Sequence, residues 1–237
     1  MLKIVSDLLL ACDRGQVSLL ALLDLLAAFD TVDHEILLGR LHQAFEIRGS
    51  ALEWIKSFVT GRVQTVVFAG EKSVESSAMW CPQGSVLGPI LFLLYCAEVT
   101  HIAEHNNINV HSYADDTQLY IHCDVTECAT ASASLSSCIE ELESWMTSNR
   151  LKLNADKTQF IWTGSRQQVA KINIAAIVLK GHQITPECCV KCLGVFIDTN
   201  LTFAPHVRRV AASCFWQIRQ LWKIRQSLSV ENAKTLV

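Results

Sequence analysis

The octapeptide Tyr-Ala-Asp-Asp-Thr-Gln-Leu-Tyr, residues 113–120, places two carboxylates, Asp115 and Asp116, side by side. The flanking residues 108–113 and 117–122 predict the two strands of a hairpin. Side chains alternate between the faces of a strand, so two adjacent aspartates serve one site only where the backbone turns, as at a hairpin tip. An Asp-Asp pair in a turn is also common as simple turn chemistry. The pair indicates a chemical site only if a further acid lies beside it.

A third carboxylate, Asp24, ends the apolar run Ser18–Leu23. This run predicts a strand buried on both faces, and such a strand rarely ends on an aspartate without a cap or a cation. Three carboxylates packed together repel one another, and at least one pKa rises unless cations are present. Two magnesium ions would relieve this repulsion, activate a 3′-hydroxyl and stabilise a leaving pyrophosphate. The acids therefore predict two-metal nucleotidyl transfer.

The composition indicates a globular chain of one large domain or a domain and a half. Of its 237 residues, 50% are apolar and 18% are charged, and the net charge is −3. The longest uncharged apolar stretch, Val86–Ala97, contains Gly88 and Pro89 and is too short to span a bilayer, so no membrane span is predicted. Residues 1–12 do not resemble a secretory signal. We expect an intracellular protein, nuclear or cytoplasmic and not secreted.

Ten cysteines without an export signal predict reduced thiols rather than a disulfide scaffold. The cluster Cys188, Cys189 and Cys192 could suggest zinc, but no second pair lies at ligand spacing. Small buried hydrophobic side chains are the favoured interpretation of most of these thiols.

The order of expected elements alternates between helix and strand, which is typical of an α/β chain. Asp33 is expected to cap a helix, and Ser50 with Glu53 to form the capping box of the next one. Residues 63–68 predict a strand that returns in a hairpin through residues 74–79.

Further elements are expected in the second half of the chain. Residues 82–89 form a turn that begins an apolar helix reaching toward His105, and an amphipathic helix ends before Leu151. The expected later elements are short strands at residues 159–163, 172–179 and 193–198, followed by a final helix with Val207, Val210, Cys214, Ile218 and Leu221 on one face.

Basic residues gather near the C-terminus despite the negative net charge. The segment after Pro205 contains a single acid, Glu231, and six basic residues: Arg208, Arg209, Arg219, Lys223, Arg225 and Lys234. On charge alone, a solvated helix face and a nucleic-acid contact are equally good interpretations.

Five segments of the chain, in order, resemble the motifs of reverse transcriptases from non-LTR (LINE-type) retrotransposons. They are LLDLLAAFDTVDHEIL at 22–37, PQGSVLGPILFLLY at 82–95, YADDTQLY at 113–120, LKLNADKTQF at 151–160 and KCLGVFIDTNLTFAPHV at 191–207. The resemblance implies an α/β (α+β) right-hand polymerase, in which a palm combines an antiparallel sheet with packed helices. It assigns residues 1–185 to the palm, with a short remnant of the fingers at 1–16. Residues 186–237 would form a primer-grip-like hairpin and the start of a helical thumb, and the fingers would be largely absent.

By motif position, the resemblance implies a catalytic and metal-binding triad of Asp24, Asp115 and Asp116, to which the backbone carbonyl of Leu25 adds a ligand. The implied cofactor is Mg²⁺, as two ions, with Mn²⁺ possible. The implied partners are an RNA template, a DNA primer and deoxynucleoside triphosphates.

The resemblance also implies roles around the triad. Phe29 matches the aromatic steric gate that excludes a 2′-hydroxyl, although an ordinary core phenylalanine is the alternative. Gln83 and Gly84 would line the incoming nucleotide, and Lys157 would lie near the pyrophosphate. The remaining roles are the primer grip, Lys191, Leu193 and Gly194, and nucleic-acid contacts from Arg208, Arg209, Arg219 and Lys223.

The chain departs from the family pattern at Leu26, where a small polar residue is usual, and at Trp80-Cys81, where Gly-Val is usual. A tryptophan beside the nucleotide pocket would fill space that the substrate needs. Two functions therefore stand: an RNA-directed DNA polymerase domain, or a catalytically inactive retrotransposon remnant that keeps a folded palm and binds nucleic acid weakly.

Overall fold

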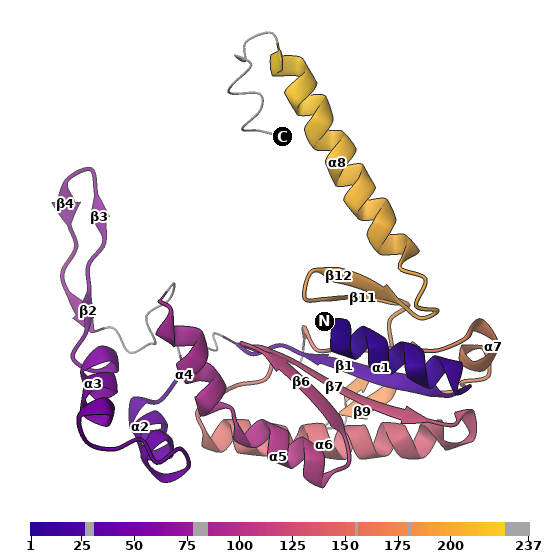
Figure 1. Ribbon diagram of the computed structural model, residues 1–237, viewed down its shortest axis with the longest axis horizontal. Coiled ribbons are helices and arrows are strands. Elements are labelled where there is room, and N and C mark those ends of the chain that lie inside the picture. Colours follow the sequence, from indigo (N-terminus) through magenta and orange to yellow (C-terminus); the bar gives the residue numbers. More distant parts are fainter. Residues whose placement is uncertain (27–30, 78–84, 155, 180–181, 226–237) are drawn as a thin grey trace.

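The computed structural model describes residues 1–26, 31–77, 85–154, 156–179 and 182–225 (Figure 1). Its centre is a four-stranded sheet in the order β6-β7-β1-β8, with every neighbouring pair antiparallel. The strands are β1 (Val17–Leu23), β6 (Asn109–Tyr113), β7 (Asp116–Cys123) and β8 (Gln159–Thr163). The predicted antiparallel sheet with packed helices is thereby confirmed.

Strand β1 lies between β7 and β8, and all of its residues except Leu22 are buried. Its side chains alternate between two hydrophobic cores, one on each face of the sheet. Leu19 and Ala21 enter the core that also contains helix α6 (Cys128–Ser148), whereas Leu20 enters the core beneath helix α1 (Leu2–Asp13). The prediction that this apolar run forms a strand buried on both faces is therefore confirmed.

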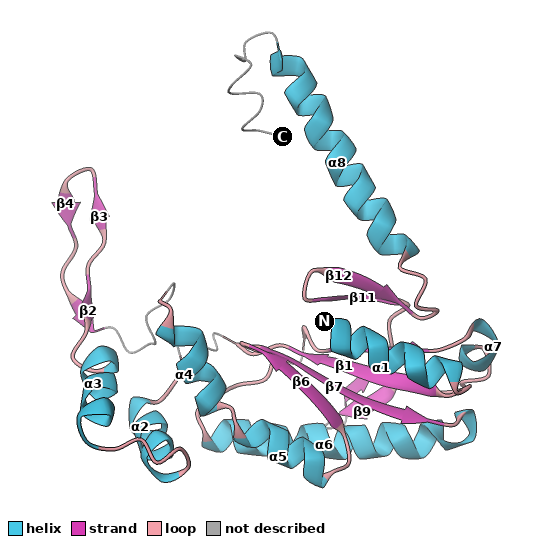
Figure 2. Ribbon diagram, in the orientation of Figure 1, coloured by secondary structure: helices cyan, strands magenta, loops and turns pink. Residues whose placement is uncertain are grey.

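Helices cover both faces of the sheet (Figure 2). On one face, α6 and α5 (Glu98–His105) pack below the strands, and α6 buries an amphipathic stripe at helical spacing. On the other face, Ile4 and Leu8 of α1 join the second core, which extends to the hairpin of β11 (Cys189–Cys192) and β12 (Val195–Asp198). The sheet is thus held in place from both sides.

Two short helices, α2 (His34–Gln43) and α3 (Gly49–Val59), precede an exposed hairpin. Asp33 caps α2 as predicted, because its Oδ1 accepts hydrogen bonds from the backbone N–H groups of residues 35 and 36. The capping box predicted from Ser50 and Glu53 is wrong. Helix α3 starts at Gly49, with Arg48 at the N-cap, so the hydroxyl of Ser50 lies too far inside the helix to cap it.

The hairpin after α3 projects away from the sheet (Figure 1). Four two-residue strands make two separate ladders: β2 (Val63–Gln64) pairs with β5 (Ser76–Ser77), and β3 (Val67–Phe68) pairs with β4 (Glu71–Lys72). The predicted hairpin is correct, but its first arm is not one continuous strand. No core lies beneath these described residues to hold a longer ladder straight.

The apolar helix expected after residue 89 is two helices, α4 (Leu87–Tyr95) and α5. Together they extend the apolar segment beyond the stretch considered in the sequence, to Leu87–His105. By length and composition alone this segment is sufficient to cross a membrane, since its 19 residues contain an 18-residue window with a mean hydropathy of 1.3. Core helices pass the same test, and Leu91, Phe92 and Tyr95 are buried in the main core.

The last third contains small elements and one long helix. Strand β9 (Ile177–Leu179) is shorter than predicted and pairs with β10 (His182–Ile184), and α7 (Arg166–Val169) is a single turn. A 3-10 turn at Val125–Glu127 precedes α6. Helix α8 (Ala204–Ile224) leaves the body of the protein at its base and has no buried residue (Figure 1).

Candidate active site

The strand register brings the three predicted acids to one edge of the sheet. Leu23 pairs with Thr117 across β1 and β7, so Asp24 and Asp116 follow as neighbours at the ends of these strands. Asp115 lies in the two-residue turn between β6 and β7, where Tyr113 pairs with Asp116. The hairpin tip predicted from the octapeptide is correct. Residues about 90 positions apart in the chain thus share one site.

The electrostatics of Asp116 reflect this arrangement. Burial raises the pKa of its carboxyl, and the neighbouring carboxylates of Asp115 and Asp24 raise it further. Each of these effects disfavours the charged form of Asp116. A cation at this edge of the sheet would remove the penalty, which is the behaviour expected of a metal-binding acid.

Asn154, which was not among the predicted site residues, holds Asp24 in place. Its Nδ2 donates to Oδ2 of Asp24 at 3.0 Å, and its backbone N–H donates to the backbone carbonyl of Asp24 at 2.8 Å. Asn154 is only 8% exposed. Its carbonyl also accepts hydrogen bonds from the backbone N–H groups of Lys157 and Thr158. One asparagine therefore connects the end of β1 to the turn that carries Lys157.

Lys157 lies against the same carboxylate. Its Nζ is 3.4 Å from Oδ2 of Asp24, and its side chain is 70% exposed. Both described partners of the Asp24 carboxylate thus contact Oδ2, and Oδ1 receives no hydrogen bond within the described part of the chain. The ammonium group is positioned to interact with negative charge at this edge of the sheet.

Two of the three predicted acids, Asp24 and Asp116, line a cavity of about 370 Å³, whereas Asp115 is not part of its lining. Its lining combines Asp24, Asp116, Asp156, Lys157, Gln159 and Lys191. Both signs of charge are present, so the cavity suits a ligand that carries phosphate together with a divalent cation. Lys191 comes from the β11–β12 hairpin, which places this hairpin beside the predicted triad.

The β11–β12 hairpin turns through Leu193 and Gly194, at φ +46° and +85°. Two positive φ values match the primed turns that two-residue hairpins prefer. Behind the turn, Cys192 is buried, and its pKa is raised to about 11, chiefly by burial, with the N-terminal amino group lowering it and Asp116 raising it. Of the predicted residues, Lys191 lines the cavity, and Leu193 and Gly194 form the turn of the same hairpin.

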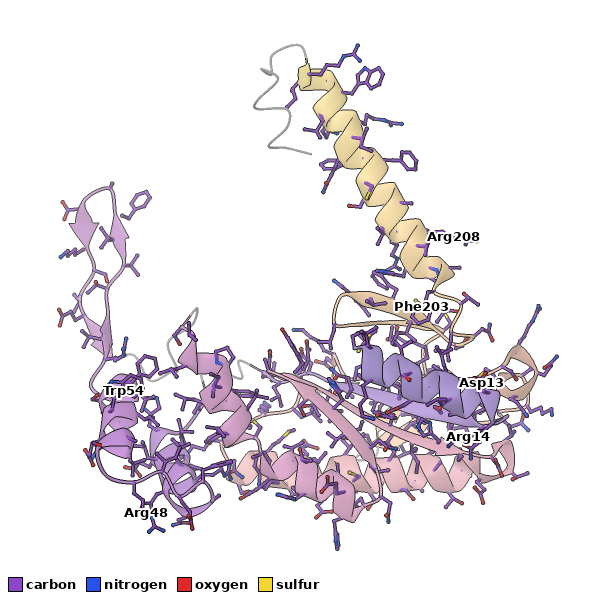
Figure 3. All side chains as sticks on the ribbon, in the orientation of Figure 1. Asp13, Arg14, Arg48, Trp54, Phe203 and Arg208 are labelled. Carbon is purple, nitrogen blue, oxygen red and sulfur yellow. The ribbon has the colours of Figure 1, made fainter. Side chains whose placement is uncertain are left out.

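Helix α8 begins above this hairpin (Figure 3). Its Arg209 lies over the ring of Phe196 in β12, with Cζ 3.7 Å from the ring centroid. Residues seven and fourteen positions later, Trp216 and Lys223, continue the face of α8 that contacts the hairpin. Arg208 and Arg219 lie eleven residues apart and share a different face. The four predicted basic residues are exposed but do not form one stripe.

Some predicted site residues fall outside the described part of the chain: Phe29, Gln83 and Gly84, as well as Trp80-Cys81. Leu25 is described. The backbone N–H of Leu26 donates to the carbonyl of Lys152, and the backbone N–H of Asn154 donates to the carbonyl of Asp24. This short bridge does not use the carbonyl of Leu25. The carbonyl oxygen of Leu25 is therefore not occupied by this bridge, which is a requirement for a metal ligand.

Within the described residues, no group of three His, Cys, Asp or Glu side chains is close enough to hold a metal ion. The nine described cysteines are free thiols, and Cys188, Cys189 and Cys192 do not form a metal site. The donor chemistry at the sheet edge nevertheless fits magnesium, because carboxylate and carbonyl oxygens are its preferred ligands. The raised pKa of Asp116 marks the repulsion that such an ion would relieve.

Comparison with known proteins identifies the family. The sequence profile described as "Reverse transcriptase (RNA-dependent DNA polymerase)" matches residues 3–197. The chain belongs to this family. The resemblance predicted from the five motifs is confirmed, and related polymerases of non-LTR mobile elements align with nearly the whole reverse transcriptase chain.

Two relatives come from Drosophila melanogaster. One is the probable RNA-directed DNA polymerase from transposon BS, 27% identical over 99% of this chain and 26% of the relative. The other is the RNA-directed DNA polymerase from mobile element jockey, 27% identical over 96% of this chain and 25% of the relative. The reverse transcriptase chain thus spans about a quarter of the length of these relatives.

Solved structures support the fold. Telomerase from Candida albicans, in complex with a fragment of telomeric RNA, superposes with a TM-score of 0.58 at 15% identity over 84% of this chain and 34% of that one. Apo telomerase from Candida tropicalis gives a TM-score of 0.58 at 12% identity over 85% of this chain and 39% of that one. At these identities, the likeness concerns the reverse transcriptase fold alone.

Proposed function

We propose that the chain is an RNA-directed DNA polymerase domain that extends a primer on an RNA template. The observation that carries this proposal is the register of β1, β6 and β7, which brings Asp24, Asp115 and Asp116 to one edge of the sheet beside a cavity. In this proposal the central sheet is the palm of a right-hand polymerase, the β11–β12 hairpin is the primer grip and α8 is the start of the thumb. The domain bounds 1–185 and 186–237 belong to the same proposal.

Asp24, Asp115, Asp116 and the carbonyl of Leu25 would hold the divalent cations, Mg²⁺ or alternatively Mn²⁺. Bound there, the cations supply the Lewis acidity that activates the primer 3′-hydroxyl and neutralises the triphosphate. Asn154 keeps one oxygen of Asp24 engaged, which leaves Oδ1 for a ligand. Lys157 is within reach to stabilise the charge that develops on the departing pyrophosphate.

The surroundings of the cavity support the proposed substrates. Lys191 provides a positive charge from the hairpin side, suited to a primer phosphate. Phe29, Gln83 and Gly84 remain our proposed contacts for the sugar of a deoxynucleoside triphosphate. On α8, the face that continues from Arg209 through Lys223 is the better oriented of its two basic faces for the nucleic-acid backbone. We also propose an intracellular location, in the nucleus or the cytoplasm.

The test is primer extension on poly(rA)/oligo(dT) with magnesium, comparing the chain with its Asp115→Asn, Asp116→Asn double variant. We expect extension by the chain and a loss of at least about a thousandfold in the variant, because removal of both acids abolishes the metal site. Circular dichroism of both proteins controls for folding. Equal extension by the two proteins would refute the proposed roles of these acids.

The alternative function is an inactive retrotransposon remnant that binds nucleic acid weakly. The contact between Lys157 and Asp24 favours it, because the ammonium group already pairs with a carboxylate that the polymerase proposal needs for a metal. A folded chain that shows no extension with Mg²⁺ or Mn²⁺, yet binds primer–template in a salt-dependent way, would establish this alternative.

A further inference from the structure

Among the described residues, helix α8 contacts strand β12 near its base. None of its residues between Ala204 and Ile224 is buried, and it projects from the body of the protein (Figure 1). A helix of this length is about 30 Å long, so a tilt of about 10° at the base would move its far end by about 5 Å. The residues between β12 and α8 consequently decide the direction of the whole helix.

Asp198, the last residue of β12, organises this base. Its Oδ2 accepts hydrogen bonds from the backbone N–H of Thr202 at 3.2 Å and from the hydroxyl of Thr202 at 3.0 Å. Its Oδ1 accepts the backbone N–H of Phe203 at 2.8 Å. Asp198 is 9% exposed, so these donors satisfy a carboxylate that has lost most of its contact with water.

The backbone of this turn adopts a conformation that needs support. Leu201 and Phe203 have φ values of +54° and +57°, in the left-handed region that side chains other than glycine rarely adopt. Their side chains pack into the second core, together with residues of α1 and the β11–β12 hairpin. Side-chain packing on one side and the Asp198 carboxylate on the other therefore fix the turn.

The turn passes directly into the helix. Phe203 is the N-cap of α8, and its carbonyl accepts the N–H of Val207. The amide held by Asp198 thus belongs to the residue that starts the helix, with no flexible linker between them. Arg209, in the second turn of the helix, lies on Phe196 of β12 and links α8 back to the hairpin that lines the cavity.

From these contacts we propose that Asp198 is a positioning residue that sets the direction of α8 over the β11–β12 hairpin and thereby controls how tightly primer–template is held. It contacts no substrate and does not enter the chemistry. The second half of this statement rests on the proposed polymerase function, whereas the first half concerns the folded chain alone.

The first experiment measures amide hydrogen exchange in the full chain and in Asp198→Asn, in which an amide NH₂ can face the bound N–H groups. We expect exchange to rise at least about tenfold across residues 199–209, because charged acceptors of this kind typically contribute that much protection. Exchange across β1 should stay unchanged. Asp13→Asn, at an exposed position at the end of α1 (Figure 3), is the matched control and should change neither region.

The second experiment measures primer–template binding by fluorescence anisotropy and single-nucleotide addition at saturating primer–template. We expect Asp198→Asn to weaken binding about fivefold to tenfold, with kcat within about twofold of the parent chain. Unchanged exchange across residues 199–209 would overturn the proposal. A lower kcat with unchanged binding would also overturn it, because Asp198 would then act on the chemistry.

Two further readouts keep the test decisive. If exchange across β1 also rises in Asp198→Asn, the Thr202→Val variant takes its place, because it removes only one donor to Asp198. We expect a smaller rise in exchange across residues 199–209 and no change across β1. If the parent chain extends no primer, the polymerase function fails, but exchange and anisotropy still decide whether Asp198 positions α8 and supports binding.

Discussion

The carboxamide of Asn154 donates to Oδ2 of Asp24 across 130 residues of sequence, at 3.0 Å. The backbone groups of the same two residues are joined at 2.8 Å, so both the main chain and the side chain of the acid are fixed. A carboxylate held in this way loses little rotamer freedom when a ligand arrives. Asn154 therefore belongs to the site, although it bears no charge and was not among the residues predicted for it.

If the chain is the proposed polymerase, replacing Asn154 with alanine should reduce kcat for primer extension by about tenfold to a hundredfold, because misplacing the proposed catalytic carboxylate of Asp24 carries a cost of that size. The Mn²⁺ affinity of the chain, followed by electron paramagnetic resonance, should fall in parallel. Asn200→Ala, at an exposed position with no described side-chain hydrogen bond, is the control. A kcat within twofold of the parent would show that Asp24 needs no such support.

Arg40 joins α2 to the rest of the fold, and its side chain is only 9% exposed. Its guanidinium donates to the carbonyl of Tyr95, to Glu98 at 3.1 Å and to Asn149 at 2.9 Å. Arg40→Ala should lower the free energy of unfolding by about 3 kcal/mol, since it removes the guanidinium donor of two largely buried acceptors, the carbonyl of Tyr95 and the side chain of Asn149. Urea denaturation measures this change. The exposed Arg48→Ala should stay within about 0.5 kcal/mol, and a similar loss in both variants would contradict the argument.

The hydrogen bond between Tyr120 and Asp7, 2.6 Å long, docks α1 on the sheet. This hydrogen bond lowers the pKa of the Asp7 carboxyl. Burial raises that pKa, and Lys3 lowers it again. Because the folded pKa lies below the unfolded value, the stabilisation is present above about pH 4 and is lost as the pH falls through the folded pKa. Asp7→Asn should therefore cost about 1 kcal/mol at pH 7 and progressively less below pH 4. Urea unfolding at several pH values would show this, and a pH-independent difference would rule it out.

Ala114 precedes Asp115 in the hairpin tip with φ at +53°, a strained value for alanine. Ala114→Gly should raise the free energy of unfolding by about 0.5 kcal/mol, and Ala114→Val should lower it by about 1–2 kcal/mol, because branching at Cβ is poorly tolerated there. Thermal denaturation measures both. Ala133→Gly, at an exposed position within α6, should have the opposite sign and destabilise by about 1 kcal/mol. Destabilisation by glycine at both positions would show that Ala114 is unstrained.

The elements that follow from local pattern were predictable from the sequence. The run Ser18–Leu23 specified a buried strand, residues 113–120 specified a hairpin tip, and Asp33 specified the start of α2. Each depends on side-chain periodicity or on hydrogen bonds within a few residues, which a short segment contains in full. The capping box at Ser50 was wrong because the N-cap of α3 lies two residues earlier, at Arg48, and such a shift changes which side chain can cap the helix.

What only the tertiary structure decided involves partners distant in the chain. The bond from Asn154 to Asp24, the position of Lys191 at the cavity and the contact of Arg209 with Phe196 join residues from different elements. The apolar face predicted for the final helix also remains exposed, since periodicity indicates that a face is apolar but not what covers it. The sequence by itself determined the buried strand β1, the hairpin tip and the identity of the acids. Packing of the sheet between its two cores determined which side chains meet them, because burial is a property of the whole fold.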